Sequence, residues 1–260
     1  MEMARHSFSH DGLTLSYLDS PSRGEPLVAL HAHWMEAATF RALAATLAPK
    51  WRVVALDQRG HGFSSHAPSY TRNDYLGDLD ALLEHLGLRH VALLGNSLGG
   101  VNAYQYAARR PERVSALVVE DIGTEIRDDV SMGRKWAGLF GTRAELEAAI
   151  GPQLLPALRE SVRETADGWR VAFDPEEMVR SQENLNGDHW SDWLASTCPA
   201  LVIRGKASPL TKEQHLREMA SRRSNAQFLE LDGGHAVHLD SPDAFASAVT
   251  NFLSAQALHT

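Results

Sequence analysis

The sequence predicts an α/β protein whose sheet is mostly parallel and covered by helices on both faces. Short aliphatic runs alternate along the chain with segments of helical periodicity, which is the pattern of consecutive βαβ units. A Gly-x-Ser-x-Gly turn at residues 95–99 joins one of these runs directly to a helical segment. The alternation stops near residue 124 and resumes near residue 197, which indicates an insertion between two strands.

Buried strands are predicted where short aliphatic runs lie between turn signals. A short N-terminal hairpin should include residues 13–17, and the next strands are expected at 27–30, 53–56, 91–94 and 116–119, with helices between them at 37–47, 72–86 and 99–109. After the insertion, strands at 200–203 and 227–231 alternate with helices at 213–219 and 242–253. Residues 1–123 and 197–260 should therefore form one core domain.

The insertion, residues 124–196, is predicted to form a helical cap. Its large aromatic side chains are Trp136, Phe140, Trp169, Phe173, Trp190 and Trp193. Ligands of parallel α/β sheets bind at the carboxyl ends of the strands, so we expect Trp136, Phe140 and Trp190 to contact a substrate there. The alternative is that these rings only pack the small core of the cap itself.

Length, composition and charge exclude several classes of protein. The 260 residues, 43% of them hydrophobic, suffice for one α/β domain with an insertion. The start of the chain has no apolar segment typical of a signal peptide, and no run approaches the roughly 18 residues that cross a bilayer, so we expect a cytoplasmic protein. The formal charge of −8 is spread along the chain, which disfavours a nucleic-acid partner. The single cysteine, Cys198, excludes an internal disulfide and is interpreted as a small core residue.

Ser97 is the candidate nucleophile. The apolar run 91–94 precedes it and a helical segment follows it, so the serine lies on a tight turn between a strand and a helix. Gly95 and Gly99 flank Ser97 where a Cβ atom would collide with a neighbouring strand or helix. A helix that begins at the nucleophile also directs backbone N–H groups toward a developing oxyanion.

A serine nucleophile requires a base, and His235 is the candidate. It follows Gly233 and Gly234 in the loop after the last predicted strand, at the edge of the sheet that also carries Ser97. The same loop contains His238, which we interpret as a loop-packing or substrate-binding residue.

The acid that orients the base is expected at the end of strand 116–119. Two carboxylates, Glu120 and Asp121, stand there, and alternation along a strand sends them to opposite sides. We choose Asp121 because it lies closer to the strand end, which leaves Glu120 as a structural carboxylate.

The oxyanion donors are predicted to be the backbone N–H groups of Leu98 and His33. His33 lies in the loop that follows the strand at 27–30. The imidazole of His31 is expected to hold this loop by hydrogen bonding, whereas His33 and Trp34 are candidates for lining the substrate site. A metal site on His31 and His33 is the alternative, but the sequence lacks a following Asp-His pair, and we predict no metal.

The segment from Asp57 to Gly62 alternates glycine with charged residues after a strand. A catalytic role for Asp57 or His61 is one interpretation. We favour a structural network in which Arg59 and Asp57 brace neighbouring loops.

Together these residues resemble the α/β-hydrolase superfamily. The resemblance rests on the serine turn at residues 95–100, the segment Asp57-Gln58-Arg59-Gly60-His61-Gly62 and the terminal Gly234-His235. It covers the chain outside the cap. It implies an eight-stranded, mostly parallel sheet, no cofactor, and a helical lid after strand six. Two positions depart from the family pattern. The usual His-Gly pair reads His31-Ala32, and Ser208 replaces the acid after strand seven, as in a subgroup of esterases and lactonases with the acid after strand six.

The resemblance implies a serine hydrolase of a small-molecule carboxylic ester or lactone that carries an apolar or aromatic group. The alternatives are a C–C bond hydrolase of ring-cleavage diketones, which Asn96 favours and Ser208 disfavours, a cofactor-independent dioxygenase, and a binding protein that keeps the scaffold as a ligand pocket. The serine argues against the dehalogenases and epoxide hydrolases of similar fold, which attack with an aspartate.

Overall fold

The computed structural model describes residues 2–256 and contains an eight-stranded sheet, as predicted. The strand order is β1-β2-β4-β3-β5-β6-β11-β12; β1 and β2 are antiparallel to their neighbours, and the six strands from β4 to β12 are parallel. The strands are β1 (Ala4–His10), β2 (Leu13–Asp19), β3 (Glu25–Leu30), β4 (Trp51–Leu56), β5 (Val91–Asn96), β6 (Val114–Glu120), β11 (Ala200–Gly205) and β12 (Ala226–Leu231).

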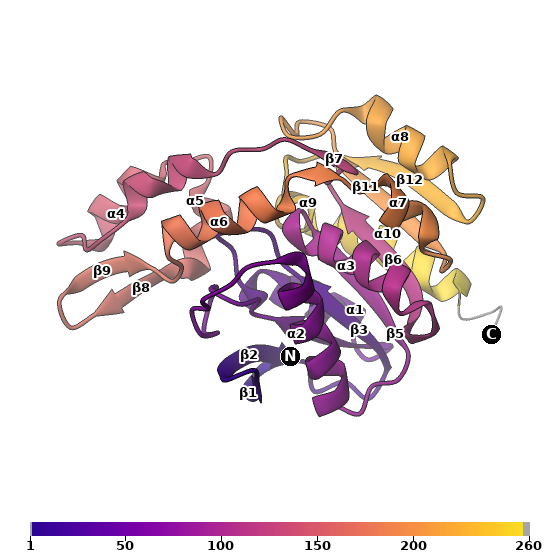
Figure 1. Ribbon diagram of the computed structural model, residues 1–260, viewed down its shortest axis with the longest axis horizontal. Coiled ribbons are helices and arrows are strands. Elements are labelled where there is room, and N and C mark those ends of the chain that lie inside the picture. Colours follow the sequence, from indigo (N-terminus) through magenta and orange to yellow (C-terminus); the bar gives the residue numbers. More distant parts are fainter. Residues whose placement is uncertain (1, 257–260) are drawn as a thin grey trace.

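Helices cover both faces of this sheet (Figure 1). On one face, α1 (Arg41–Leu47) and α10 (Pro242–Gln256) pack on one set of alternating strand residues, which includes Leu27 and Val53. On the other, α2 (Arg72–His85), α3 (Leu98–Arg109) and α8 (Glu213–Ser221) pack on the second set, which includes Val28 and Val54. Strands buried on both faces explain why their sequences are continuous aliphatic runs.

Several short elements complete the core domain. The helix predicted at 37–47 begins as a 3₁₀ turn, η1 (Ala37–Phe40), before α1. Another 3₁₀ turn, η2 (Pro111–Arg113), leads into β6. Residues 232–236, which carry His235 and which we call the histidine loop, connect β12 to α9 (Val237–Asp240).

The segment between β6 and β11 contains strands as well as helices. Its elements are β7 (Glu125–Ile126), η3 (Ser131–Trp136), α4 (Arg143–Ile150), α5 (Leu155–Leu158), η4 (Arg159–Ser161), β8 (Val162–Thr165), β9 (Gly168–Val171), α6 (Pro175–Leu185), β10 (Gly187–Asp188) and α7 (Trp190–Ala195). Strands β8 and β9 form an antiparallel hairpin, and β10 pairs with β7. The turn between β8 and β9 uses Gly168 at a φ of 140°, which L side chains rarely adopt.

We call residues 124–196 the cap. Its elements α4, β8 and β9 extend beyond the sheet domain at the left of Figure 1, and α6 leads back toward α3. Within residues 2–256, no helix combines the length and the apolar character that crossing a membrane requires.

Candidate active site

Ser97 lies on a strained turn between β5 and α3. Its φ of 52° and ψ of −117° are rare for a residue with a side chain. The flanking glycines permit the turn: a Cβ atom on Gly95 would lie 2.1 Å from the carbonyl oxygen of Gly99, and one on Gly99 would lie 2.1 Å from that of Leu30. The serine side chain is partly exposed and makes no capping hydrogen bond to α3. This geometry presents the hydroxyl at the carboxyl edge of the sheet.

Hydrogen bonds connect this turn to the two segments that carry the candidate acid and base. The backbone N–H of Ser97 donates to the carbonyl oxygen of Glu120 at 3.0 Å. The side chain of Asn96 donates to the carbonyl oxygen of His235 at 2.9 Å. Ser97 and its neighbour Asn96 are therefore bonded to the end of β6 and to the loop that carries His235.

Asp121 and His235 form a hydrogen-bonded pair. Nδ1 of His235 lies 2.7 Å from Oδ2 of Asp121. The carboxylate is fully buried, whereas the His235 side chain is 21% exposed, so a substrate can reach the imidazole. Asp121 adopts a φ of 49°, a second strained backbone position at this edge.

Besides His235, three donors contact the carboxylate of Asp121, one from the last residue of β11 and two from the segment that follows it. Oγ of Ser208 donates to Oδ2 at 2.5 Å, Oγ1 of Thr211 donates to Oδ1 at 2.8 Å, and the N–H of Gly205 donates to Oδ1 at 3.2 Å. The strand exit that lacks an acid thus stabilises the acid of the neighbouring strand. Sequence analysis missed this role; the signal was a serine and a threonine within a few residues of the strand end.

Glu120 binds His238, not the candidate base. Both of its carboxylate oxygens lie 2.9 Å from Nδ1 of His238, and Oε1 also accepts from the His238 backbone N–H at 2.9 Å. Both side chains are fully buried, and Phe40 stacks on the His238 ring at 4.7 Å. Burial leaves His238 no surface for a substrate contact, contrary to the interpretation of it as a substrate-binding residue.

The second oxyanion donor is expected in residues 31–36, which connect β3 to η1 and which we call the oxyanion loop. Leu98 is the first residue of α3, a position whose N–H has no partner inside the helix. Ala32 stands where the family usually has glycine, and it does not adopt a positive φ, so its side chain causes no backbone strain. The residue of this loop with a positive φ is Trp34, at 69°.

The imidazoles of His31 and His33 serve as hydrogen-bonding groups. Nε2 of His31 accepts from the backbone N–H of Gln58 at 3.0 Å, and Nε2 of His33 lies 2.8 Å from Oγ of Ser181. Burial lowers the pKa of His31 to about 4 and holds that of His33 well below its usual value. Among residues 2–256, no cluster of three potential metal ligands is found.

The charged segment after β4 braces loops. Both carboxylate oxygens of Asp78 accept from Arg59, at 2.7 and 2.8 Å. Asp57 accepts from the backbone N–H of Ala37 at 2.8 Å and is fully buried. His61 is also buried, with Nδ1 2.9 Å from the carbonyl oxygen of Arg59. These contacts match the structural interpretation of this segment.

The aromatic residues that were predicted to contact a substrate lie in different parts of the structure. Trp136 is fully buried and donates to the carbonyl oxygen of Ala149, so its ring packs within the cap instead of facing the sheet edge that carries Ser97 and His235. The backbone of Phe140 pairs with Trp169. Trp190 donates to the carboxylate of Glu125, and its ring contacts Arg222 and His215. Trp34, in the oxyanion loop, packs edge-on against Trp136 at 5.0 Å. The cap aromatics are thus used mainly for packing.

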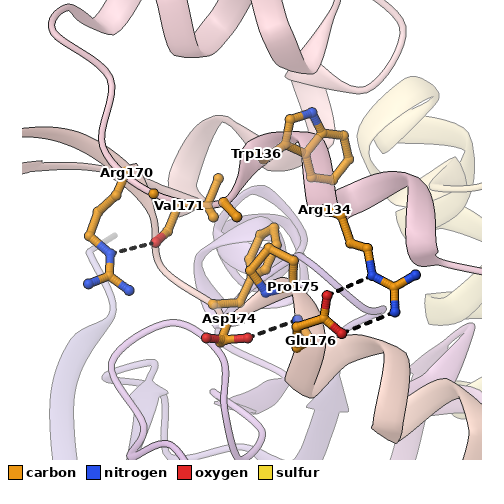
Figure 2. A pocket seen from close by; sticks show the side chains of 10 residues that line it. Arg134, Trp136, Arg170, Val171, Asp174, Pro175 and Glu176 are labelled. Atoms are coloured by element: carbon orange, nitrogen blue, oxygen red, sulfur yellow. Dashed lines mark hydrogen bonds and ion pairs between the residues drawn. The ribbon is translucent and has the colours of Figure 1, made fainter.

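The cap contains a pocket between η3, β9 and the start of α6 (Figure 2). Its labelled lining residues are Arg134, Trp136, Arg170, Val171, Asp174, Pro175 and Glu176. Arg134 is already paired with Glu176, at 2.6 Å, and Asp174 caps α6. Neither the turn at residues 95–99 nor the histidine loop contributes a residue to the lining of this pocket.

The fold is α/β, and the carboxyl edge of its sheet carries the candidate nucleophile, acid and base. The chain belongs to the alpha/beta hydrolase family, whose model matches residues 27–248.

Two relatives and one solved structure are similar to the chain. It is 29% identical to a 2-(acetamidomethylene)succinate hydrolase of Mesorhizobium japonicum, over 94% of this chain and 92% of that protein. It is 30% identical to the sn-1-specific diacylglycerol lipase ABHD11 of Mus musculus, over 93% and 86% of the two chains. A crystal structure of E-2-(acetamidomethylene)succinate hydrolase superposes with a TM-score of 0.86 at 24% identity, covering 97% of this chain and 99% of that one.

Proposed function

We propose that this protein is a serine hydrolase that cleaves a small-molecule carboxylic ester or lactone. The single observation that carries the proposal is the 2.7 Å contact between Asp121 and His235, at the sheet edge where Ser97 lies on a strained turn. A nucleophile, a base and a buried acid in the chain order serine, acid, histidine support this chemistry. The mouse relative is named a lipase, which is consistent with ester cleavage.

In the proposed mechanism, Oγ of Ser97 attacks the carbonyl carbon and transfers its proton to Nε2 of His235. Asp121 accepts a hydrogen bond from Nδ1 and stabilises the imidazolium that forms. The N–H groups of Leu98 and His33 donate to the oxyanion of the tetrahedral intermediate. His235 then protonates the leaving alcohol, and the acyl-enzyme remains.

Hydrolysis of the acyl-enzyme uses the same groups in reverse. His235 removes a proton from a water molecule, which attacks the acyl carbon, and it then returns a proton to Ser97. The proposed substrate carries an apolar or aromatic group. Trp34 supports this choice, because this large apolar residue lies in the oxyanion loop and is partly exposed.

The test is mass spectrometry of the intact protein after treatment with an organophosphonate, together with turnover of p-nitrophenyl esters of increasing chain length. We expect one adduct on the wild type, none on Ser97→Ala, and turnover that only the wild type supports. Thermal unfolding of both proteins serves as the folding control. If the wild type is neither labelled nor active on any ester or lactone, the proposal is refuted.

A further inference from the structure

The oxyanion loop is hydrogen-bonded to the core at its beginning, and the cap contacts it at His33, Trp34 and Glu36. At the beginning, His31 accepts two hydrogen bonds from Gln58, one from the backbone to its ring and one from the side chain to its carbonyl oxygen at 2.6 Å. Gln58 follows β4 and belongs to the core domain. The first residue of the loop is therefore fixed independently of the cap.

His33 contacts the cap through its side chain. Its Nε2 lies 2.8 Å from Oγ of Ser181 in α6, and the hydroxyl of Tyr75 in α2 lies 2.7 Å from the same oxygen. All three side chains are buried, with Ser181 at 0% and His33 at 6% exposure. Because water does not reach this chain of polar groups, His33 would lose a buried hydrogen bond if the cap moved away.

Two further cap contacts reach the loop, one at the backbone of Trp34 and one at the side chain of Glu36. Oγ of Ser161 in the cap donates to the carbonyl oxygen of Trp34 at 2.7 Å. The left-handed φ of 69° at Trp34 is unfavourable for a residue with a large side chain, so it persists only where neighbours hold it. Further along the loop, Arg163 of the cap donates to the buried carboxylate of Glu36.

We propose that the cap positions the backbone N–H of His33 through Ser181 and Ser161, so that the oxyanion hole is complete only while the cap is docked on the core. The proposal rests on the function proposed above, which gives that N–H its catalytic role. An oxyanion donor must lie about 2.7–3.1 Å from the developing charge, so a small displacement of the loop removes much of its contribution. Ser181 and Ser161 are positioning residues that act through His33 and Trp34.

The first test measures hydrogen exchange of the backbone amides of residues 31–36 in the Ser181→Ala and Ser161→Ala proteins. Tyr70→Phe is the matched control, because the Tyr70 hydroxyl donates to Glu177 of α6 at 2.6 Å and thus joins the same cap helix to the core outside the loop. We expect exchange to be about tenfold faster in the two serine variants and unchanged in the control. Unchanged exchange in the serine variants overturns the proposal.

The second test compares kinetics with the affinity for an alkyl boronic acid, which mimics the tetrahedral intermediate. We expect kcat and the boronate affinity of Ser181→Ala to fall together by about tenfold while KM changes less than twofold, because the oxyanion hydrogen bond is made in the transition state. Faster exchange with unchanged kcat and boronate affinity overturns the catalytic part. A wild type that is inactive and unlabelled refutes the hydrolase function, whereas the exchange result still decides whether the cap holds the loop.

Discussion

Nδ1 of His238, in α9, lies 2.9 Å from both carboxylate oxygens of Glu120, and Nδ1 of His235, in the loop before α9, lies 2.7 Å from Asp121. Two consecutive carboxylates at the end of β6 thus bind two imidazoles that are three residues apart. The pair of Glu120 and His238 is fully buried, whereas His235 is 21% exposed. The geometry therefore separates a loop-holding pair from a pair that a substrate can reach.

This separation predicts different effects of neutralising the two carboxylates. Asp121→Asn should lower kcat by about 10³- to 10⁴-fold, because an amide can neither fix the productive tautomer of His235 nor stabilise its imidazolium. The measurement is kcat on the best ester found for the wild type, with thermal unfolding to verify that the variant is folded.

Glu120→Gln should reduce kcat by less than about tenfold and act mainly on stability. It weakens a buried, charge-assisted contact that holds the histidine loop, which costs about 1–3 kcal/mol. The measurements are kcat and the free energy of unfolding. A larger loss of kcat in Glu120→Gln than in Asp121→Asn would make Glu120 the acid.

Replacing Ser208 tests whether Asp121 acts as the acid that stabilises the His235 imidazolium. Its hydroxyl donates to Oδ2 of Asp121, the same oxygen that contacts His235. Ser208→Ala removes this donor, so Asp121 should bind the imidazolium more strongly and the acid limb of the kcat/KM profile should move to higher pH. Thr211→Val, which removes a donor from Oδ1, is the matched comparison and should move the limb less. A shift to lower pH in Ser208→Ala would contradict this account.

Local sequence predicted the groups that lie at strand ends. The turn around Ser97 and the loop of His235 each follow directly from a strand, and parallel strands bring their carboxyl ends to one edge, so short segments were sufficient to predict that both lie at this edge. The mostly parallel sheet followed from the alternation of aliphatic runs and helical segments, whereas its eight strands were implied by the resemblance to α/β hydrolases.

Contacts between the cap and the core were not predictable in this way. His33 and Ser181 are 148 residues apart, and neither has a local pattern that indicates the other. The orientation of Trp136 likewise depends on how the cap folds: its ring nitrogen bonds Ala149 and its ring is fully buried, although its sequence equally fits an exposed contact residue. The β8–β9 hairpin was missed because two four-residue strands give a short alternation signal.

Buried neutral histidines predict a loss of stability in acid. Burial lowers the pKa of His61 to about 3, whereas an unfolded chain has the usual value near 6.5. Below pH 6.5 the unfolded state therefore binds more protons, and stability falls toward pH 3 by at most about 1.4 kcal/mol per pH unit for this group. His61→Phe should show a shallower fall of the unfolding free energy between pH 6.5 and 4.5. Replacement of the exposed His90 by Gln should leave the slope unchanged, and an unchanged slope in His61→Phe would contradict the burial argument.

The buried carboxyl of Glu36 should change the free energy of unfolding with pH in the opposite direction. Burial raises the pKa of this carboxyl from 4.5 to about 7 despite the guanidinium of Arg163. Between pH 4.5 and 7 the folded state therefore binds more protons at this group, so its contribution to stability is complete below pH 4.5 and is lost as the pH rises through 7. Relative to the wild type, Glu36→Gln should become more stable as the pH rises from 5 to 8. Urea unfolding at both pH values gives this difference, and a relative loss of stability at pH 8 would show that the ion pair with Arg163 outweighs the cost of burying the carboxylate.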